Sequence, residues 1–414
     1  MEGDRMQRIK KNLEMITDAD HPGKVLENSV GKGGKNVVVV HLKNTCKVLA
    51  KDQAPMARFP GSQPVSLLRY HLQTLRERSY YVCEKSDGVR YLLLIHKSKD
   101  FDTGKYAKIF LVDRQFRFTP LPGLDILFEG EEGSRLFSYI NHTLLDGELI
   151  VDEIPTKDGG HRKQAMFLVF DAISIQGRFV GNLDLFDRLR VAQGCIVQKF
   201  QDLMRKLPEE TQAKLPFIMT LKQMFRKEDV GFVLDRVIPE LPHENDGLIF
   251  TRVDLPFKIG TCEGILKWKP KHMNSVDFEV LVKWLGKSQV DPTQEKRYCL
   301  LFSARRGTPF EYSFIYLSKE EQLMLLEKYE GKPVVIEVTL DDNTQGMKIP
   351  DGATSWDQVE YTSPPGWKFM RVREDKKLGN DINTVERVIE SINSGITGEF
   401  LKDMLGPKKK NTSR

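Results

Sequence analysis

Short apolar runs recur along the chain, and residues that favour turns separate them. The clearest pair surrounds Lys85, with residues 80–82 before it and residues 91–95 after it. Both runs are rich in aromatic and branched side chains, which predicts two strands. The pair Asp87-Gly88 lies between them, and glycine accepts a positive φ without steric cost. We therefore expect a tight turn there, with Lys85 at the end of a strand and its amine near the mouth of a sheet.

The same patterning predicts the architecture of most of the chain. Residues 51–272 alternate apolar runs with turn clusters and a few helical patterns, such as residues 183–201. This mixture indicates an α+β domain with antiparallel strands. From residue 275 onward, five short alternating runs predict a small barrel of the oligonucleotide-binding (OB) type. These runs are residues 276–284, 298–302, 312–317, 334–340 and 367–373.

Near the end of the chain, apolar residues recur with helical spacing at Ile382, Val385, Ile389 and Ile392. They share one face of a predicted helix, for which Asn383 or Thr384 is the expected N-cap. Because 414 residues exceed one ordinary core, we expect several parts. These are an N-terminal extension (1–50), an α+β domain (51–272), an OB-fold domain (273–380), a C-terminal helix (381–406) and a basic tail (407–414).

Composition narrows the class of protein. A hydrophobic content of 40% and a charged content of 29% are typical of a soluble globular chain. No apolar run approaches the ~20 residues that span a bilayer. The five scattered cysteines contain no C-x-x-C pair, which argues against a disulfide framework and favours a reducing compartment. The net charge of +5 permits contact with a polyanion. The Gly- and Lys-rich run 31–35 has the composition of a phosphate cradle, but no strand precedes it, so a linker is expected.

The stretch around Lys85 carries the first candidate chemistry. A buried lysine can lose its proton and attack an electrophile. Arg90, just beyond the turn, can hold a sugar or phosphate oxygen through charge-assisted hydrogen bonds. An ordinary surface hairpin with solvated charges is the alternative interpretation.

Two further Asp-Gly pairs present carboxylates. One places Glu148 beside Asp146-Gly147, and the other presents Asp246 before Gly247. Each alone is more often an ordinary strand end. If these predicted turns meet the lysine turn at one sheet edge, their carboxylates can hold a divalent cation.

Basic residues form two more candidate surfaces. Lys267 and Lys269 lie two apart and so share one face of a predicted strand; an edge strand protected by lysines is the alternative. Arg371 and Arg373 follow Trp367 and Phe369 with the same spacing. Aromatic and arginine side chains together suit nucleotides, through stacking and phosphate contact. A solvated barrel face is the competing interpretation of this run.

Taken together in order, these motifs resemble the covalent nucleotidyltransferases, which comprise the capping-enzyme guanylyltransferases and the DNA and RNA ligases. The motifs are K-S-D-G-V-R (85–90), D-G-E-L (146–149), F-L-V-F-D-A (167–172), D-G-L-I-F (246–250), L-K-W-K-P (266–270) and R-V-R-E-D-K (371–376). The run 59–67 and the form of the last two motifs are most similar to mRNA capping guanylyltransferases, and ligases usually carry glutamate where Asp246 stands. The resemblance implies a nucleotidyltransferase domain with antiparallel sheets followed by an OB-fold domain.

The resemblance also implies roles for individual residues. Lys85 would be the nucleophile that takes GMP from GTP. Arg90 and Glu148 would contact the ribose, and Phe170, rather than Phe167, would stack on the guanine. Asp246 would lie with Glu148 near a divalent metal, Mg²⁺ or Mn²⁺.

Five cations and two acids complete the implied set. Lys267 and Lys269 would grip the α-phosphate, and Asp277 matches the acidic residue that follows them in the family. The remaining residues would act on the β- and γ-phosphates; they are Arg371, Arg373, Asp375 and Lys376.

The implied activity is transfer of GMP from GTP to the 5′-diphosphate end of RNA, in the nucleus, with no membrane partner. The chain lacks an H-C-x-x-x-x-x-R phosphatase signature, so a separate RNA 5′-triphosphatase is an expected partner. The phosphorylated C-terminal tail of RNA polymerase II is another that the resemblance implies. Two alternatives stay open: an ATP-dependent RNA or DNA ligase, and a non-catalytic relative that binds RNA or the polymerase tail.

Overall fold

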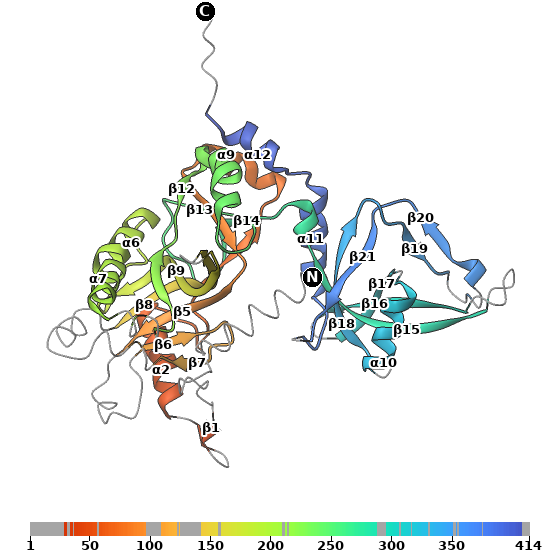
Figure 1. Cartoon of the computed structure of the whole chain (residues 1–414), viewed down its shortest axis with the longest axis horizontal. Coiled ribbons are helices and arrows are strands. Elements are labelled where there is room, and N and C mark those ends of the chain that lie inside the picture. Colours follow the sequence, from red (N-terminus) through yellow and green to blue (C-terminus); the bar gives the residue numbers. More distant parts are fainter. Residues whose placement is uncertain are drawn as a thin grey trace, which may run out of the picture. The chain divides into compact units, whose positions relative to one another are not determined.

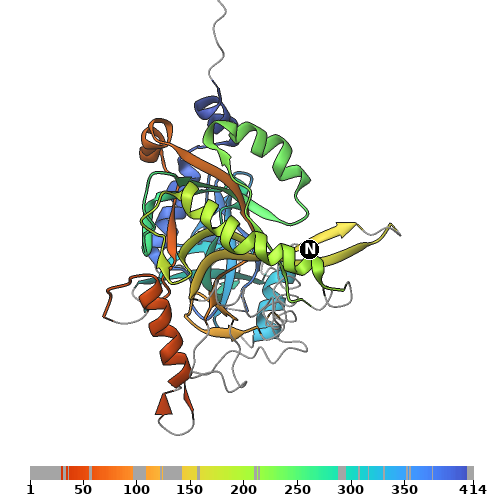
Figure 2. The same cartoon turned by 90° about the vertical axis from the view of Figure 1, so that its left-hand side faces the viewer.

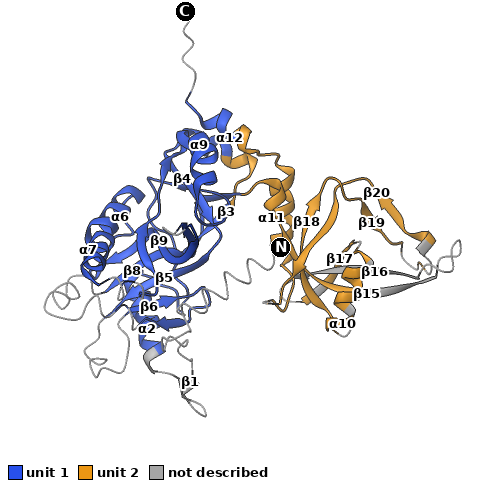
Figure 3. Ribbon diagram, in the orientation of Figure 1, with its two compact units in different colours: residues 1–65, 72–268, 401–414 blue, residues 66–71, 269–400 orange. Residues whose placement is uncertain are grey.

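Two units make up the chain in the computed structural model (Figures 1 and 3). Unit 1 comprises Met1–Val65, Leu72–Trp268 and Leu401–Arg414, and unit 2 comprises Ser66–His71 and Lys269–Phe400. The structure describes residues 29–407 with internal gaps. The gaps are residues 31–33, 36, 56–57, 97–108, 122–123, 125–141, 156–158, 209–211, 213–214, 288–294, 306–307, 316, 330–331, 351–352, 354–355 and 375. The basic tail beyond residue 407 therefore lies outside the described residues.

A seven-stranded sheet forms the larger part of unit 1. Six strands run in the order β10-β9-β8-β5-β6-β7, all antiparallel to their neighbours, and β11 pairs with β9 in parallel. The strands are β5 (Val89–Ile95), β6 (Ile109–Val112), β7 (Phe118–Pro120), β8 (Thr143–Pro155), β9 (His161–Ile175), β10 (Arg178–Phe179) and β11 (Ile218–Leu221).

Both faces of this sheet are buried, because its strands carry continuous apolar runs. On β5, Leu93 and Ile95 join one apolar core, whereas Leu92 and Leu94 join a core on the opposite face. Helices α6 (Leu185–Ala192) and α7 (Gln198–Lys206), joined by a π-helical turn at Gln193–Val197, cover the first core (Figure 2). Helix α2 (Val37–Leu49) covers the second core, so the N-terminal extension contributes to unit 1.

A second, five-stranded sheet completes unit 1, in the order β12-β4-β13-β14-β3. Its strands are β3 (Ser62–Ser66), β4 (Tyr80–Ser86), β12 (Phe225–Arg226), β13 (Asn245–Arg252) and β14 (Gly260–Trp268). The two strands predicted around Lys85 are confirmed as β4 and β5. They belong to different sheets, so the surface-hairpin interpretation is wrong: Asp87-Gly88 carries the chain from one sheet to the other.

The other two Asp-Gly pairs are not turns, which corrects the prediction. Asp146-Gly147 lies inside β8 and Asp246-Gly247 inside β13, and the strand pairing shifts register at both places. Such bulges bend a strand and re-aim the side chains beside them. Gly147 is required by space, because a Cβ there would lie 2.5 Å from the Phe167 ring. Gly247 has φ 140°, which side-chain-bearing residues rarely adopt.

Unit 2 is built on a five-stranded antiparallel sheet in the order β17-β16-β15-β18-β21. These strands are β15 (Val276–Lys287), β16 (Glu295–Arg305), β17 (Thr308–Ile315), β18 (Val334–Asp341) and β21 (Gly366–Val372). They correspond to the five runs predicted for the OB-type domain, so the α+β class with antiparallel sheets is confirmed. Helices α10 (Lys319–Tyr329) and α11 (Ile382–Asn393) contribute to its apolar core.

The predicted C-terminal helix is instead two helices, α11 and α12 (Gly398–Leu405), separated by Gly395 with φ 63°. The predicted N-cap was also wrong. Asp381 caps α11, and its carboxylate accepts a hydrogen bond from the Asn383 backbone N–H. Asp381 is as suitable an N-cap as the predicted residues, so the error lay in the residue at which the helix begins.

Several small elements complete the described chain. They are β1 (Ser29–Val30), β2 (Gly34–Lys35), α3 (Leu72–Glu77), α9 (Val230–Phe232), β19 (Gly346–Lys348), β20 (Glu360–Thr362) and the 3₁₀ turns Arg69–His71, Lys227–Asp229, Ile238–Glu240, Lys271–Met273 and Trp356–Gln358, with a π-helical turn at Val233–Val237. Part of the predicted linker 31–35 thus pairs as a strand, and its residues 31–33 are outside the described part. Within the described residues, no helix is both long and apolar enough to cross a membrane.

Candidate active site

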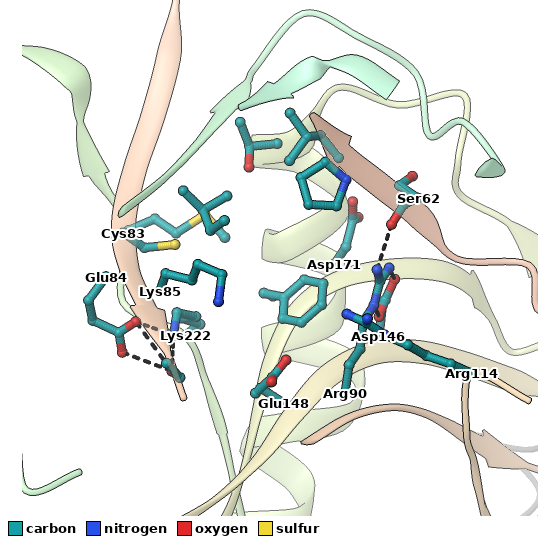
Figure 4. A pocket seen from close by; sticks show the side chains of 17 residues that line it. Ser62, Cys83, Glu84, Lys85, Arg90, Arg114, Asp146, Glu148, Asp171 and Lys222 are labelled. Atoms are coloured by element: carbon teal, nitrogen blue, oxygen red, sulfur yellow. Dashed lines mark hydrogen bonds and ion pairs between the residues drawn. The ribbon is translucent and has the colours of Figure 1, made fainter. Parts of the chain in front are cut away.

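A pocket opens between the two sheets of unit 1 (Figure 4). Four residues that the motifs singled out line it together: Lys85, Arg90, Glu148 and Phe170. Lys85 comes from the end of β4, whereas the other three come from β5, β8 and β9 of the larger sheet. The pocket is therefore built where the Asp87-Gly88 connection joins the sheets.

Lys85 is held by a carboxylate on the neighbouring strand. Its Nζ donates a hydrogen bond of 2.5 Å to Asp246 Oδ1, and both side chains keep about a quarter or less of their surface exposed (25% and 20%). The register shift in β13 falls between Asn245 and Leu248, so the bulge contains Asp246. The amine is thus fixed in direction but still open to a ligand.

Arg90 is locked by a buried ion pair. Its Nε and Nη2 donate to the two Asp146 oxygens over 2.9 and 2.5 Å, and its Nη1 donates to the Ser62 carbonyl over 2.6 Å. Its guanidinium carbon lies 5.4 Å from the centre of the Phe170 ring. Bidentate pairing fixes the plane of a guanidinium, so Arg90 presents one orientation to a ligand.

Glu148 has an altered acidity. Burial raises its pKa from the ordinary 4.5 to about 7, and the nearby charges of Lys85 and Lys222 only partly oppose this. Desolvation disfavours the ionised carboxylate because the pocket wall offers less solvation than water. A carboxyl that is poised between its two forms near neutral pH is common at functional sites.

Among the described residues that line this pocket, Phe170 is the one aromatic side chain from β9. The next residue, Asp171, pairs in bidentate fashion with Arg188 of α6, at 2.6 and 3.0 Å. Phe167 instead lies fully buried against Phe217 in the core, with ring centres 5.4 Å apart. Phe167 is therefore unavailable for stacking on a ligand.

Three charged residues outside the predicted motifs also line the pocket: Glu84, Arg114 and Lys222. Lys222 follows β11 and is nearly buried, with 6% of its side chain exposed. Its Nζ pairs with Glu84 and donates to the Ser86 hydroxyl. The sequence offers only a weak signal for Lys222, a lysine directly after the mostly apolar run 217–221.

The predicted phosphate-binding groups of unit 2 gather on two acids. Arg373 donates to Asp277 over 2.8 Å, and Lys376 also pairs with Asp277. Arg371 donates to Glu337 over 2.6 Å. Asp277 and Glu337 lie opposite each other on β15 and β18, so the cations are needed to offset their repulsion. Asp375 lies outside the described residues.

The aromatic part of that predicted surface is wrong. Trp367 is buried in the core of unit 2, and Phe369 packs against the same core. On β21 the pairing shifts between Phe369 and Arg371, so the bulge turns the arginine to a different environment from the two rings.

The remaining predicted residues are placed as follows. Lys267 lies on β14 opposite Ile249 of β13, and Ile249 lines the pocket. Lys269 follows the end of β14 and belongs to unit 2. In the described chain, no group of three or more His, Cys, Asp or Glu side chains is arranged to hold a metal ion. Glu148 and Asp246, which both interact with Lys85, suit an ion that takes its other ligands from water and phosphate.

Comparisons with known proteins cover nearly the whole described chain. The profile described as "mRNA capping enzyme, catalytic domain" matches residues 28–271, and "mRNA capping enzyme, C-terminal domain" matches residues 273–402. The mRNA-capping enzyme subunit alpha of Schizosaccharomyces pombe is 33% identical over 352 residues, which are 84% of this chain and 80% of that protein. The protein of the same name from Neurospora crassa is 29% identical over 389 residues, 93% of this chain and 91% of its own.

Among solved structures, a mycobacterial DNA ligase D complexed with ATP and MES overlaps 77% of this chain and 95% of its own. The TM-score is 0.36 and the identity 16%, which is too weak to bear on function.

Proposed function

The chain belongs to the mRNA capping enzyme family, and from this we propose that it is a GTP–RNA guanylyltransferase in which Lys85 carries the GMP group. The observation that supports this role for Lys85 is its placement in the pocket. A primary amine points into a pocket whose walls carry an aromatic ring, a locked guanidinium and carboxylates that include Glu148 (Figure 4). Nucleotides need these groups: a platform for the base, donors for ribose and phosphate, and oxygen ligands for a counter-ion.

In the first step, the lone pair of Lys85 Nζ attacks the α-phosphorus of GTP. The N–P bond forms, the bond from the α-phosphorus to the bridging oxygen breaks, and pyrophosphate leaves with those electrons. The amine must lose a proton before it can attack. Asp246 accepts a hydrogen bond from Nζ at 2.5 Å, which places it to receive that proton.

In the second step, a terminal oxygen of a 5′-diphosphate RNA attacks the same phosphorus. The P–N bond breaks as its nitrogen takes up a proton, and Lys85 regains its amine. The cations of unit 2, Arg371, Arg373 and Lys376, would act in the first step. They suit the β- and γ-phosphates, because charge-assisted hydrogen bonds stabilise a leaving pyrophosphate. Asp277 and Glu337 keep these side chains ordered before the nucleotide arrives.

A divalent cation, Mg²⁺ or Mn²⁺, would be held by Glu148 and Asp246 together with phosphate oxygens. Such an ion would neutralise charge on the phosphates. Lys267 and Lys269 would contact the α-phosphate from the end of β14.

Base choice follows from the pocket wall. Phe170 offers a stacking face, and Ile249 also lines the pocket. Lys222 can only donate hydrogen bonds. Guanine presents an acceptor oxygen where adenine presents an amino group, so a buried lysine there favours GTP over ATP.

The remaining partners follow from the activity. The RNA must arrive with a 5′-diphosphate end, so a separate RNA 5′-triphosphatase would supply it. We place the enzyme in the nucleus, in association with the phosphorylated tail of RNA polymerase II.

The test is covalent labelling. We expect the purified chain, with α-labelled GTP and Mn²⁺, to acquire acid-labile label on Lys85. The Lys85→Ala variant should acquire none, and Lys163→Ala, an exposed lysine on β9, should label like the wild type. Label from ATP but not from GTP would identify a ligase. Absence of label from either nucleotide would favour the non-catalytic alternative.

A further inference from the structure

A row of alternating charges runs away from the pocket behind Lys222. Glu84 pairs with Lys222 on one side, and on the other it accepts a hydrogen bond from His243 Nε2 over 3.1 Å. His243 Nδ1 lies 2.9 Å from Asp152 Oδ1. All four side chains are largely buried, with exposed fractions of 6% for Lys222, 8% for Glu84, 9% for His243 and 14% for Asp152.

This row joins the two sheets that form the pocket. Glu84 belongs to β4 of the five-stranded sheet, and Asp152 belongs to β8 of the seven-stranded sheet. His243 lies in the connection before β13, and its neighbours are anchored on both sides. The Glu153 N–H donates to the Pro242 carbonyl over 2.9 Å, and the Asp87 N–H donates to the Glu244 carbonyl over 2.8 Å. These hydrogen bonds fix the backbone on both sides of His243, and the contacts with Asp152 and Glu84 fix the ring itself.

Both ring nitrogens of His243 face carboxylate oxygens. An ionised carboxylate only accepts hydrogen bonds, so each nitrogen must carry a hydrogen for both contacts to form. The doubly protonated ring is a cation, and it lies between two anions. The charged groups that face it in the described chain are Asp152 from β8 and Glu84 from β4, with Lys222 beyond Glu84.

We propose that His243 is a positioning residue for nucleotide binding, which clamps the two sheets behind the pocket and, by holding Glu84, directs Lys222 at the base. The proposal deepens the guanylyltransferase function and depends on it, because it takes Lys222 as the residue that reads guanine. His243 itself does not line the pocket in the described structure. It acts through Glu84.

The clamp works only while the ring is charged. Burial opposes that charge, but the hydrogen bonds to Asp152 and Glu84 and their negative charges outweigh it and raise the pKa of His243 above 6.5. The stabilisation is thus fully present below about pH 6.5 and is lost as the pH rises through the raised pKa. Loss of the proton removes one of the two hydrogen bonds that link Asp152 to Glu84 through the ring. The position of Glu84, and with it that of Lys222, is then fixed less firmly.

The test uses the full chain and the rate of lysyl-GMP formation at a series of GTP concentrations and pH values. The variants are His243→Gln, which cannot become charged, and His161→Gln as the control, since His161 is exposed at the start of β9. The fraction of molecules labelled at saturation counts the folded enzyme in each preparation.

For the wild type and His161→Gln, we expect the half-saturating GTP concentration to rise as the pH passes upward through the titration of His243. For His243→Gln, that concentration should be about tenfold higher already at neutral pH, the cost of one charged hydrogen bond, and should then change little. Its maximal rate per labelled molecule should stay close to that of the wild type. Its preference for GTP over ATP should also fall.

Two results would overturn the proposal. In one, His243→Gln follows the wild-type curve at every pH. In the other, it loses only the labelled fraction, which would mean a purely structural role. If His243→Gln does not fold, Asp152→Asn replaces it: this change keeps an acceptor but removes a charge, so the rise in half-saturating GTP should move to lower pH. If the half-saturating GTP concentration of Asp152→Asn follows the wild-type pH dependence, the positioning role of His243 is refuted. If GTP never labels the wild type, the proposed function is refuted instead.

Discussion

Glu148→Gln should make the protein more stable at alkaline pH, although Glu148 is a proposed binding residue. The pKa of Glu148 rises from 4.5 to about 7 in the folded chain. One step in pKa is worth ~1.36 kcal/mol, so the ionised form carries a penalty of roughly 3 kcal/mol. Because Glu148 is only half-buried, solvent in the pocket reduces this penalty, and we expect about 2 kcal/mol.

The sign follows from the protons bound in each state. The unfolded chain releases the Glu148 proton near its ordinary pKa of 4.5, whereas the folded chain keeps it up to about pH 7. Stability therefore falls as the pH rises through this window, and the penalty is complete above it. Glutamine cannot ionise, so the variant avoids the penalty.

The assay is urea unfolding of wild type and variant at about pH 5 and about pH 8.5. We expect the variant to exceed the wild type by about 2 kcal/mol in free energy of unfolding at the higher pH and by less than half of that at the lower. Glu240→Gln, at an exposed glutamate of unit 1, should show no such pH-dependent difference. A gain that is equal at both pH values, or a loss at the higher one, would refute the assignment of a destabilising charge to Glu148.

Three other variants test the framework of the site. Gly147→Ala should cost about 1–3 kcal/mol of unfolding free energy, measured by urea unfolding, because the new Cβ would press on the Phe167 ring at 2.5 Å; a neutral result would mean that β8 shifts freely. Arg188→Met should cost about 3–5 kcal/mol because it strands a buried carboxylate, whereas Arg190→Met, which breaks an exposed pair on the same helix, should cost less than about 1 kcal/mol. Equal losses for the two arginine variants would contradict the burial argument. Glu337→Gln should cost about 2 kcal/mol at neutral pH. Burial opposes the Glu337 charge, but hydrogen bonds from Ser275 and Arg371 outweigh the effect of burial and lower the pKa of Glu337. The cost of the substitution should therefore shrink in acid. A cost that is independent of pH would argue against a charged role.

The pattern of apolar and polar residues correctly predicted the strands that depend only on neighbouring residues in the sequence. Strands β4 and β5 follow from apolar runs on either side of Lys85, and the five strands of unit 2 follow from alternation with a period of two. Those signals need no knowledge of distant partners. The ordered motifs then placed Lys85, Glu148 and Phe170, which the structure brings together in one pocket.

The errors arose where the outcome depends on pairing between strands. Asp-Gly connects two strands at residue 87 but lies in a bulge at residues 146 and 246, and only the neighbouring strands distinguish these cases. The bulge at Met370 likewise separates Arg371 from the rings that precede it. Lys222 was missed because a single lysine after an apolar run is common. Only the folded chain shows that it reaches Glu84.

The path of the chain through its units has a consequence for synthesis. Helix α12 belongs to unit 1, yet it follows the whole of unit 2 in the sequence. Its Leu401 and Leu405 are buried, and Lys402 pairs with Asp235 at 2.5 Å. A ribosome therefore delivers this piece of unit 1 only after the more than a hundred residues of Lys269–Phe400. Until then, the surface of unit 1 that later covers Leu401 and Leu405 is exposed in the nascent polypeptide. We expect a chaperone to bind at that apolar surface.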